Sequence, residues 1–154
     1  DARLEPWLRF EGTALDLSDA ASLNGVAATP DGDFLIVVDA KSGRLFRIEV
    51  SSRSIAEIDK GDADLTSGDG LVLDGRRLFV VRQAAGEIVR LELSEDLLTA
   101  TERRRISPQG LAWPATAALS GDRLIVANSQ LNQRSKGTPA LPFSLVSIPL
   151  SAFD

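Results

Sequence analysis

The sequence is dominated by a repeat of three similar segments. They are PDGDFLIVVDAKSGRLFRIEV (30–50), LDGRRLFVVRQAAGEIVRLEL (73–93) and LSGDRLIVANSQLN followed by FSLVSIPL (119–150). Leu35, Leu78 and Leu124 occupy the same place in each segment, at spacings of 43 and 46 residues. Antiparallel units that recur about every 40–50 residues are typical of a β-propeller, in which each sheet buries its faces against its neighbours. The repeat therefore predicts an all-β propeller fold.

Each segment is expected to form strands joined by short turns. Glycine-containing turns favour hairpins, because glycine adopts positive φ at little cost; they lie at 30–32, 74–75 and 120–121. The strands after these turns are apolar on both faces, as buried strands are; they are 34–38, 78–81 and 124–127. An immunoglobulin-like sandwich is the main alternative, but it does not predict so regular a repeat.

The repeat indicates one partial domain over residues 1–154. We expect three blades of about four strands, at about 24–60, 69–106 and 114–150. The stretch EPWLRFEGTALDL resembles the outer strands of a preceding blade, so residues 1–20 are predicted to be a blade remnant. Propellers typically need about four to eight blades to close. We therefore expect the ring to be completed by further chain of the same polypeptide or by a second copy. The start at Asp1, without Met, fits a processed protein or a piece of a longer one.

The absence of histidine and cysteine limits the possible chemistry. It excludes a disulfide, a thiolate nucleophile, a Cys/His zinc site and a Ser-His-Asp triad. Ser22 and Ser67 accordingly have no histidine to activate them. Catalysis would have to use carboxylates, amides, Lys, Arg, hydroxyls or a metal held by oxygen ligands.

The net charge of −5 argues against nucleic acid and anionic membranes as partners, because both require a basic face. The basic run Arg103–Arg105 has no interleaved aromatic residue and is predicted to be a solvated strand edge. The sequence contains no apolar run of the roughly 18 residues that span a membrane, and no signal peptide. A soluble protein, either periplasmic or secreted or cytoplasmic, is expected.

Five polar residues are expected to converge on one face of the ring. In each blade the innermost strand begins at one face of the ring. The second strand, which follows the hairpin, ends at that same face. Asn24 and Asp69 precede two innermost strands, and Asp39, Arg82 and Asn128 each follow an aligned leucine by four residues. Two interpretations stay open: the last three residues line a channel mouth, or they cap strand ends and pair with one another. Asn24-Gly25 could likewise form a simple turn or place a ligand.

A longer pattern in these segments resembles a known family. The pattern S-L-NG-[hydrophobic]-A-x-x-PDG-x-x-L-x-V-x-D is followed about 45 residues later by DG-L-x-[hydrophobic]-D-G. It resembles the senescence-marker-protein/gluconolactonase/luciferin-regenerating-enzyme-like superfamily. Members of that superfamily are six-bladed propellers, and the match covers about residues 21–150. The resemblance implies that the chain is the C-terminal half of such a propeller.

The resemblance also implies a divalent cation, Ca²⁺ first among the candidates, at the mouth of the central channel. Asn24 matches the family's ligating Asn before an innermost strand, and Asp69 matches its ligating Asp at the start of the next blade. The family's N-terminal Glu and earlier Asn have no counterpart here. The third blade has Ala115 at the position equivalent to Asp69, and alanine cannot bind a metal.

Two functions follow from the resemblance. The first is a metal-dependent lactonase or related ester hydrolase acting on a small-molecule substrate. In it, Asn24 and Asp69 hold the ion, Asp69 also accepts a proton, and Arg82 stabilises developing negative charge. The second is a non-catalytic propeller that serves as a binding or scaffold module, because many propellers only bind.

Overall fold

The computed structural model describes residues 3–16 and 22–154, and over these the chain forms three antiparallel sheets. The first sheet contains β1 (Leu23–Ala28), β2 (Phe34–Asp39), β3 (Leu45–Glu49) and β4 (Ile55–Ile58). The second contains β5 (Gly68–Asp74), β6 (Arg77–Arg82), β7 (Glu87–Leu93) and β8 (Ala100–Ile106). The third contains β9 (Pro114–Ser120), β10 (Arg123–Asn128) and β11 (Leu145–Pro149). Two 3₁₀-helices, η1 (Leu131–Lys136) and η2 (Leu150–Phe153), lie before and after β11.

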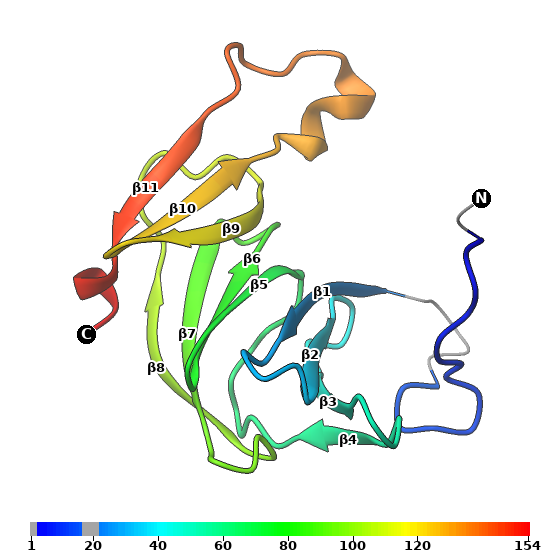
Figure 1. Cartoon of the computed structure of the whole chain (residues 1–154). Coiled ribbons are helices and arrows are strands. Elements are labelled where there is room, and N and C mark those ends of the chain that lie inside the picture. Colours follow the sequence, from blue (N-terminus) through cyan, green and yellow to red (C-terminus); the bar gives the residue numbers. More distant parts are fainter. Residues whose placement is uncertain (1–2, 17–21) are drawn as a thin grey trace.

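The three sheets are arranged as successive blades around their first strands. Within each sheet the strands follow one another in chain order. Strand β1 contacts β5, and β5 contacts β9, so the first strands lie side by side while the sheets fan outward (Figure 1). The predicted all-β, partial propeller is confirmed.

Glycines at the start of β1 and β5 allow this close approach. A Cβ on Gly25 would lie 2.0 Å from the carbonyl oxygen of Asp69, and one on Gly70 would lie 2.5 Å from Cα of Thr116. Both glycines lie inside strands, where the pairing with the neighbouring strand is irregular. Asn24-Gly25 is therefore part of a strand rather than a hairpin turn, and its glycine is required by contact with the next blade.

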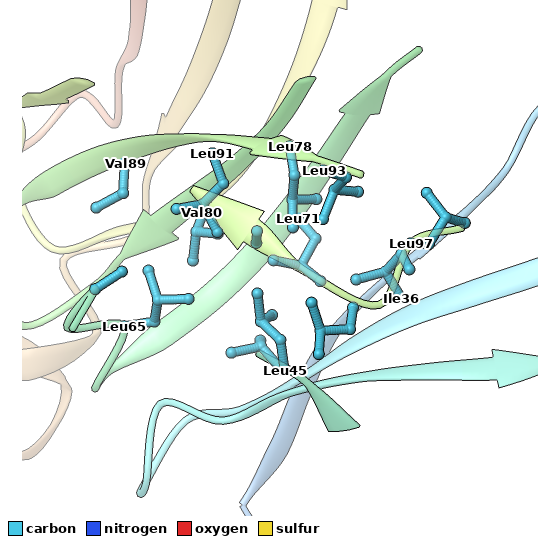
Figure 2. Packing of buried hydrophobic residues seen from close by; sticks show 14 residues of the cluster. Ile36, Leu45, Leu65, Leu71, Leu78, Val80, Val89, Leu91, Leu93 and Leu97 are labelled. Atoms are coloured by element: carbon cyan, nitrogen blue, oxygen red, sulfur yellow. The ribbon is translucent and has the colours of Figure 1, made fainter. Parts of the chain in front are cut away.

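Two apolar cores hold the blades together. The first lies between the first and second sheets and includes Leu45, Leu71 and Val80 (Figure 2). The second lies between the second and third sheets, where the rings of Phe79 and Phe153 meet edge to face with centroids 5.0 Å apart. Each blade thus buries one face against the next, as propeller packing requires.

The N-terminal segment covers the other face of the first sheet. Leu8, Phe10 and Leu15 pack there against Phe46 and its neighbours, and Leu15 is almost fully buried. Residues 3–16 nevertheless contain no strand, so they do not form the outer strands that the sequence suggested. Residues 1–2 and 17–20 of the predicted remnant lie outside the described residues.

The third sheet differs from the other two. It has three strands where four were expected. Its second and third strands are joined by residues 129–144, whereas residues 40–44 and 83–86 make the same connection in the first and second sheets. The long connection contains η1 and stands beyond the end of β10 (Figure 1, orange). We call residues 129–144 the insertion.

Neither 3₁₀-helix, nor any other helical stretch within residues 3–16 and 22–154, has the length and apolar character needed to cross a bilayer.

Candidate functional site on the inner rim

The starts of the first strands and the ends of the second strands form one edge of the structure, which we call the inner rim. Antiparallel pairing places Leu23 opposite Asp39, Gly68 opposite Arg82, and Pro114 opposite Asn128. The contacts of Gly25 with Asp69, and of Gly70 with Thr116, align these edges from blade to blade. The sequence-predicted site residues lie along this rim: Asn24, Asp39, Asp69, Arg82 and Asn128.

The carboxylate of Asp39 has a structural role in the first blade. Only 3% of its surface is exposed. Its carboxylate accepts hydrogen bonds from the hydroxyls of Ser22 and Ser42, and from the backbone N–H groups of Lys41 and Ser42, both at 3.2 Å. Burial alone would raise the pKa of Asp39, but these hydrogen bonds outweigh it, and the pKa lies below its ordinary value. Asp39 therefore ties the approach to β1 to the turn after β2.

Arg82 has the same role in the second blade, with the opposite charge. Its side chain is 9% exposed and forms ion pairs with Asp64 and Glu87. Its Nε donates to the carbonyl of Thr66 at 2.9 Å, and Nη2 donates to the Thr66 hydroxyl at 3.1 Å. Arg105 also binds Glu87, at 2.8 Å. Because the guanidinium of Arg82 is engaged on all sides, we do not include it among the candidate catalytic groups.

Asn128 completes the pattern in the third blade. Only 5% of its surface is exposed. Its Oδ1 accepts from the backbone N–H of Ala112 at 2.9 Å, and Nδ2 donates to the carbonyl of Gly110 at 2.7 Å and to the hydroxyl of Ser144 at 3.1 Å. A carboxylate, a guanidinium and an amide thus anchor equivalent loops. This geometry favours the strand-capping interpretation of Asp39, Arg82 and Asn128.

Asp69 has a different environment. It is partly buried, and its Oδ2 accepts one hydrogen bond, from Nε2 of Gln83 at 2.6 Å. Among residues 3–16 and 22–154, no Lys or Arg forms an ion pair with it, and Oδ1 has no hydrogen-bond donor. Burial raises the pKa of Asp69 above its ordinary value, and the hydrogen bond from neutral Gln83 only partly opposes this. Asp69 is therefore a partly desolvated carboxyl group with one oxygen available to a cation or a proton.

Asn24 lies beside Asp69 on the neighbouring blade. Its side chain is exposed, and the following Gly25 packs directly against the Asp69 carbonyl. Ala115, at the equivalent position of the third blade, is partly buried and has no side-chain donor. The rim thus places the backbone at Asn24-Gly25 against that of Asp69, and β9 offers no third candidate ligand.

The donor chemistry of this corner fits a hard cation only in part. Amide and carboxylate oxygens are the ligands that Ca²⁺ prefers, but Ca²⁺ takes six to eight of them. Within the described residues, no group of three or more Asp, Glu, His or Cys side chains could hold a metal. The metal-binding roles of Asn24 and Asp69 therefore stay predictions.

Sequence reasoning missed Gln83. The sequence contained a signal for Gln83. This residue directly follows Arg82, and it occupies the same position in the repeat as Ala40 and Ser129. The backbone N–H of each donates to the carbonyl of the residue just before its first strand: Ala40 to Ser22 (2.9 Å), Gln83 to Ser67 (2.9 Å) and Ser129 to Trp113 (3.2 Å). This pairing holds the position against the rim, so a long polar side chain there can reach the carboxylate of Asp69.

The fold and the rim define the chain as a segment of a β-propeller with oxygen-donor side chains at its inner edge. It is similar to hydrazine synthase from Kuenenia stuttgartiensis, with 20% identity and a TM-score of 0.60 over 84% of this chain and 34% of that one. It is also similar to a putative 6-phosphogluconolactonase from Bacteroides uniformis, with 12% identity and a TM-score of 0.60 over 82% of this chain and 36% of that one. The calcium-binding protein regucalcin from Agrobacterium tumefaciens matches with 19% identity and a TM-score of 0.52, over 82% of this chain and 45% of that one.

These similarities establish the fold alone, because all three identities are below 25% and one fold hosts many functions. The chain spans between 34% and 45% of the length of the matched structures. No family model matches it, and no curated protein matches it in sequence. The structural matches therefore show the propeller fold that the repeat predicted.

Proposed function

We propose that this chain forms part of a metal-dependent lactonase or related ester hydrolase of the propeller type. The observation that carries the proposal is the state of Asp69: a partly buried carboxyl group on the inner rim, with a raised pKa and one neutral hydrogen-bond partner. A desolvated carboxylate without a paired cation is unfavourable unless it binds a cation or a proton. Functional sites are where such groups gather.

Asn24 and Asp69 would hold the ion, through an amide oxygen and the free Oδ1. A bound divalent cation supplies Lewis acidity toward a carbonyl oxygen and lowers the pKa of bound water. The remaining ligands would come from the rest of the propeller, because this chain offers too few. The matched structures, which are more than twice as long as the matched share of this chain, support that division.

The residues of this chain have separate tasks in the proposal. Gln83 orients the Asp69 carboxylate by donating to Oδ2, which leaves Oδ1 toward the ligand. The raised pKa of Asp69 also suits it to accept a proton when no cation is bound. Asp39, Arg82 and Asn128 fix the loops of the rim and take no part in the chemistry.

Calorimetric titration of Ca²⁺ into the intact protein tests the proposal, with lactone hydrolysis followed in parallel by acid release. Asp69→Ala and Asn24→Ala are expected to weaken Ca²⁺ binding by at least about tenfold each and to lower hydrolysis with it. Asp62→Asn is the matched control, because it removes one exposed carboxylate of the same chain away from the rim. Equal Ca²⁺ affinity in all four proteins would refute the metal site.

Retained Ca²⁺ binding without hydrolysis of any lactone or ester would instead identify the protein as a binding or scaffold propeller. That outcome separates the metal site from the enzyme, because the ion can bind without a catalysed reaction.

A further inference from the structure

The insertion holds a pocket that the rim site does not use. The pocket has a volume of about 330 Å³, within the range of small-molecule sites. Its lining residues are Ser129, Gln130, Leu131, Arg134, Pro139 and Phe143. Leu131 and Phe143 are 52% and 58% exposed, so this surface presents apolar side chains to solvent. Exposed apolar side chains that gather in one place, rather than singly, are a feature of ligand-binding surfaces.

The pocket borders the inner rim. Ser129 follows Asn128 and is equivalent to Gln83, which holds Asp69 one blade away. Its backbone N–H and its hydroxyl both bond to the carbonyl of Trp113, the residue before β9. A molecule in the pocket would therefore lie next to the rim of the third blade. The insertion occurs on the blade that contributes no metal ligand of its own.

The insertion is held in shape at its neck. The Gln130 side chain donates to the carbonyl of Ala140 at 2.8 Å and accepts from the Ala140 N–H at 2.7 Å. Nearer the sheet, Asn128 bonds to Ser144 through both backbone and side chain. Two sets of bonds thus close the loop before any ligand enters. A preorganised pocket binds with less loss of conformational entropy than a loop that must fold around its ligand.

The charge of this region is positive in an acidic protein. The insertion, residues 129–144, contains Arg134 and Lys136 and no Asp or Glu, although the whole chain has a net charge of −5. Arg134 lies in the pocket lining and forms no ion pair within the described residues. A guanidinium beside apolar walls matches a ligand with an apolar body and a carboxylate, because arginine binds carboxylates with two parallel hydrogen bonds.

We infer that the pocket of the insertion binds small carboxylates with an apolar body, with Arg134 pairing the carboxylate and with Leu131, Pro139 and Phe143 packing on the body. Its use as a substrate pocket rests on the proposed hydrolase function, and it then selects lactones or esters that carry such a group. The binding itself does not depend on a metal or on catalysis.

The test is fluorescence titration of the intact protein with 3-phenylpropanoate. The chain has two tryptophans, and the backbone carbonyl of Trp113 accepts from Ser129, a lining residue of the pocket. A Trp7→Phe background therefore makes Trp113 the reporter within this chain. The uncharged alcohol, 3-phenylpropan-1-ol, and the cation, 3-phenylpropylammonium, are the matched ligands. Saturable binding is expected for the carboxylate, with affinity about tenfold lower for the alcohol and none for the ammonium ion.

Two variants separate a specific pocket from general attraction to a basic region. Arg134→Met is expected to weaken 3-phenylpropanoate binding about tenfold. Lys136→Met, which removes the same charge from an exposed position two residues away outside the lining, is expected to change it less than twofold. Phe143→Ala should weaken carboxylate and alcohol alike by several-fold. Equal effects of the two methionine variants, or equal binding of carboxylate and ammonium ion, would overturn the inference.

The outcome is independent of the proposed function. If the protein with Asp69 in place binds 3-phenylpropanoate but neither binds Ca²⁺ nor hydrolyses any lactone or ester, the pocket is supported and the hydrolase is refuted. Hydrolysis with no binding of 3-phenylpropanoate refutes the pocket and leaves the hydrolase in place.

Discussion

Asp39 and Asp69 are two carboxyl groups on the same rim, and their environments differ completely. Asp39 is more deeply buried, yet four hydrogen bonds hold its pKa below the ordinary value. Asp69 has one hydrogen bond, and burial raises its pKa. The difference shows that hydrogen-bond donors around a carboxylate can outweigh the effect of burial on its pKa, and that Asp69 lacks enough of them.

The comparison of Asp39 with Asp69 requires that β1 and β5 lie against each other on one rim. Gly25→Ala tests this requirement and has the largest expected effect. The added Cβ would overlap the Asp69 carbonyl oxygen, so the free energy of unfolding should fall by about 3 kcal/mol or more. Urea denaturation measures it. Gly32→Ala is the control: its φ is +78° with open space around the position, and a loss of about 1 to 2 kcal/mol is expected. Equal losses would remove the close contact between the blades.

The exchange of each carboxyl group for an amide contrasts the two sites directly. Asp39→Asn turns one acceptor oxygen into a donor facing other donors, so unfolding free energy should fall by about 2 to 4 kcal/mol. Asp69→Asn removes a desolvated charge and keeps an acceptor for Gln83, so the change should be below about 1 kcal/mol and stabilising at neutral pH. Denaturant unfolding of both variants in one buffer measures the two changes in unfolding free energy. Similar losses in the two variants would contradict the difference between Asp39 and Asp69.

The pH dependence of the two groups has opposite sign. The folded-state pKa of Asp39 is lowered, so its contribution is present above the unfolded pKa and is lost as pH falls through the folded pKa. The folded-state pKa of Asp69 is raised, so stability falls as pH rises from its unfolded pKa through its folded pKa. Carboxyl-carbon NMR titration should place Asp69 above the model-peptide value of about 3.8 and Asp39 below it. The reverse order would contradict the assignment.

The smallest effect is expected at Gln83. Gln83→Leu removes the one hydrogen-bond donor to Asp69, so the pKa of Asp69 should rise further while stability changes by less than about 1 kcal/mol. Gln83→Lys should reverse the shift, because an ammonium group favours the charged carboxylate. NMR titration of Asp69 in both variants provides the readout. An unchanged Asp69 pKa in both would show that Gln83 does not tune this carboxyl group.

The fold could be predicted because the repeat is long and regular. The spacing of Leu35, Leu78 and Leu124 reflects strands that occupy the same place in successive blades. The fourth strand predicted for the third sheet is not present in the described residues, because β11 is followed by the 3₁₀-helix η2 rather than by a strand. The face on which the rim residues lie also followed from strand direction alone.

The roles of the rim residues could not be predicted. Asp39, Arg82 and Asn128 lie at the ends of the second strands, but whether a polar side chain faces a ligand or its own loops depends on hydrogen-bond partners distant in sequence. Ser22 donates to Asp39, and the carbonyl of Gly110 accepts from Asn128. Asn24-Gly25 was equally ambiguous, since the requirement for glycine arises from a neighbouring blade. The metal site and the hydrolase activity remain proposals for the experiments above.

The anchoring of the rim has a consequence for how such rings can grow. The partners of Asp39 lie within residues 22–42, those of Arg82 within 64–87, and those of Asn128 within 110–144. A gene duplication that copies one blade with the loop before its first strand, which we call a unit, therefore copies its buried polar groups together with their hydrogen-bond partners. Recombination at the boundaries between units keeps each of these groups with its hydrogen-bond partners. Transfer of Asp39, Arg82 or Asn128 alone into another unit would leave a buried polar group without partners. Duplication of whole units is then the change that disrupts the fewest buried hydrogen bonds.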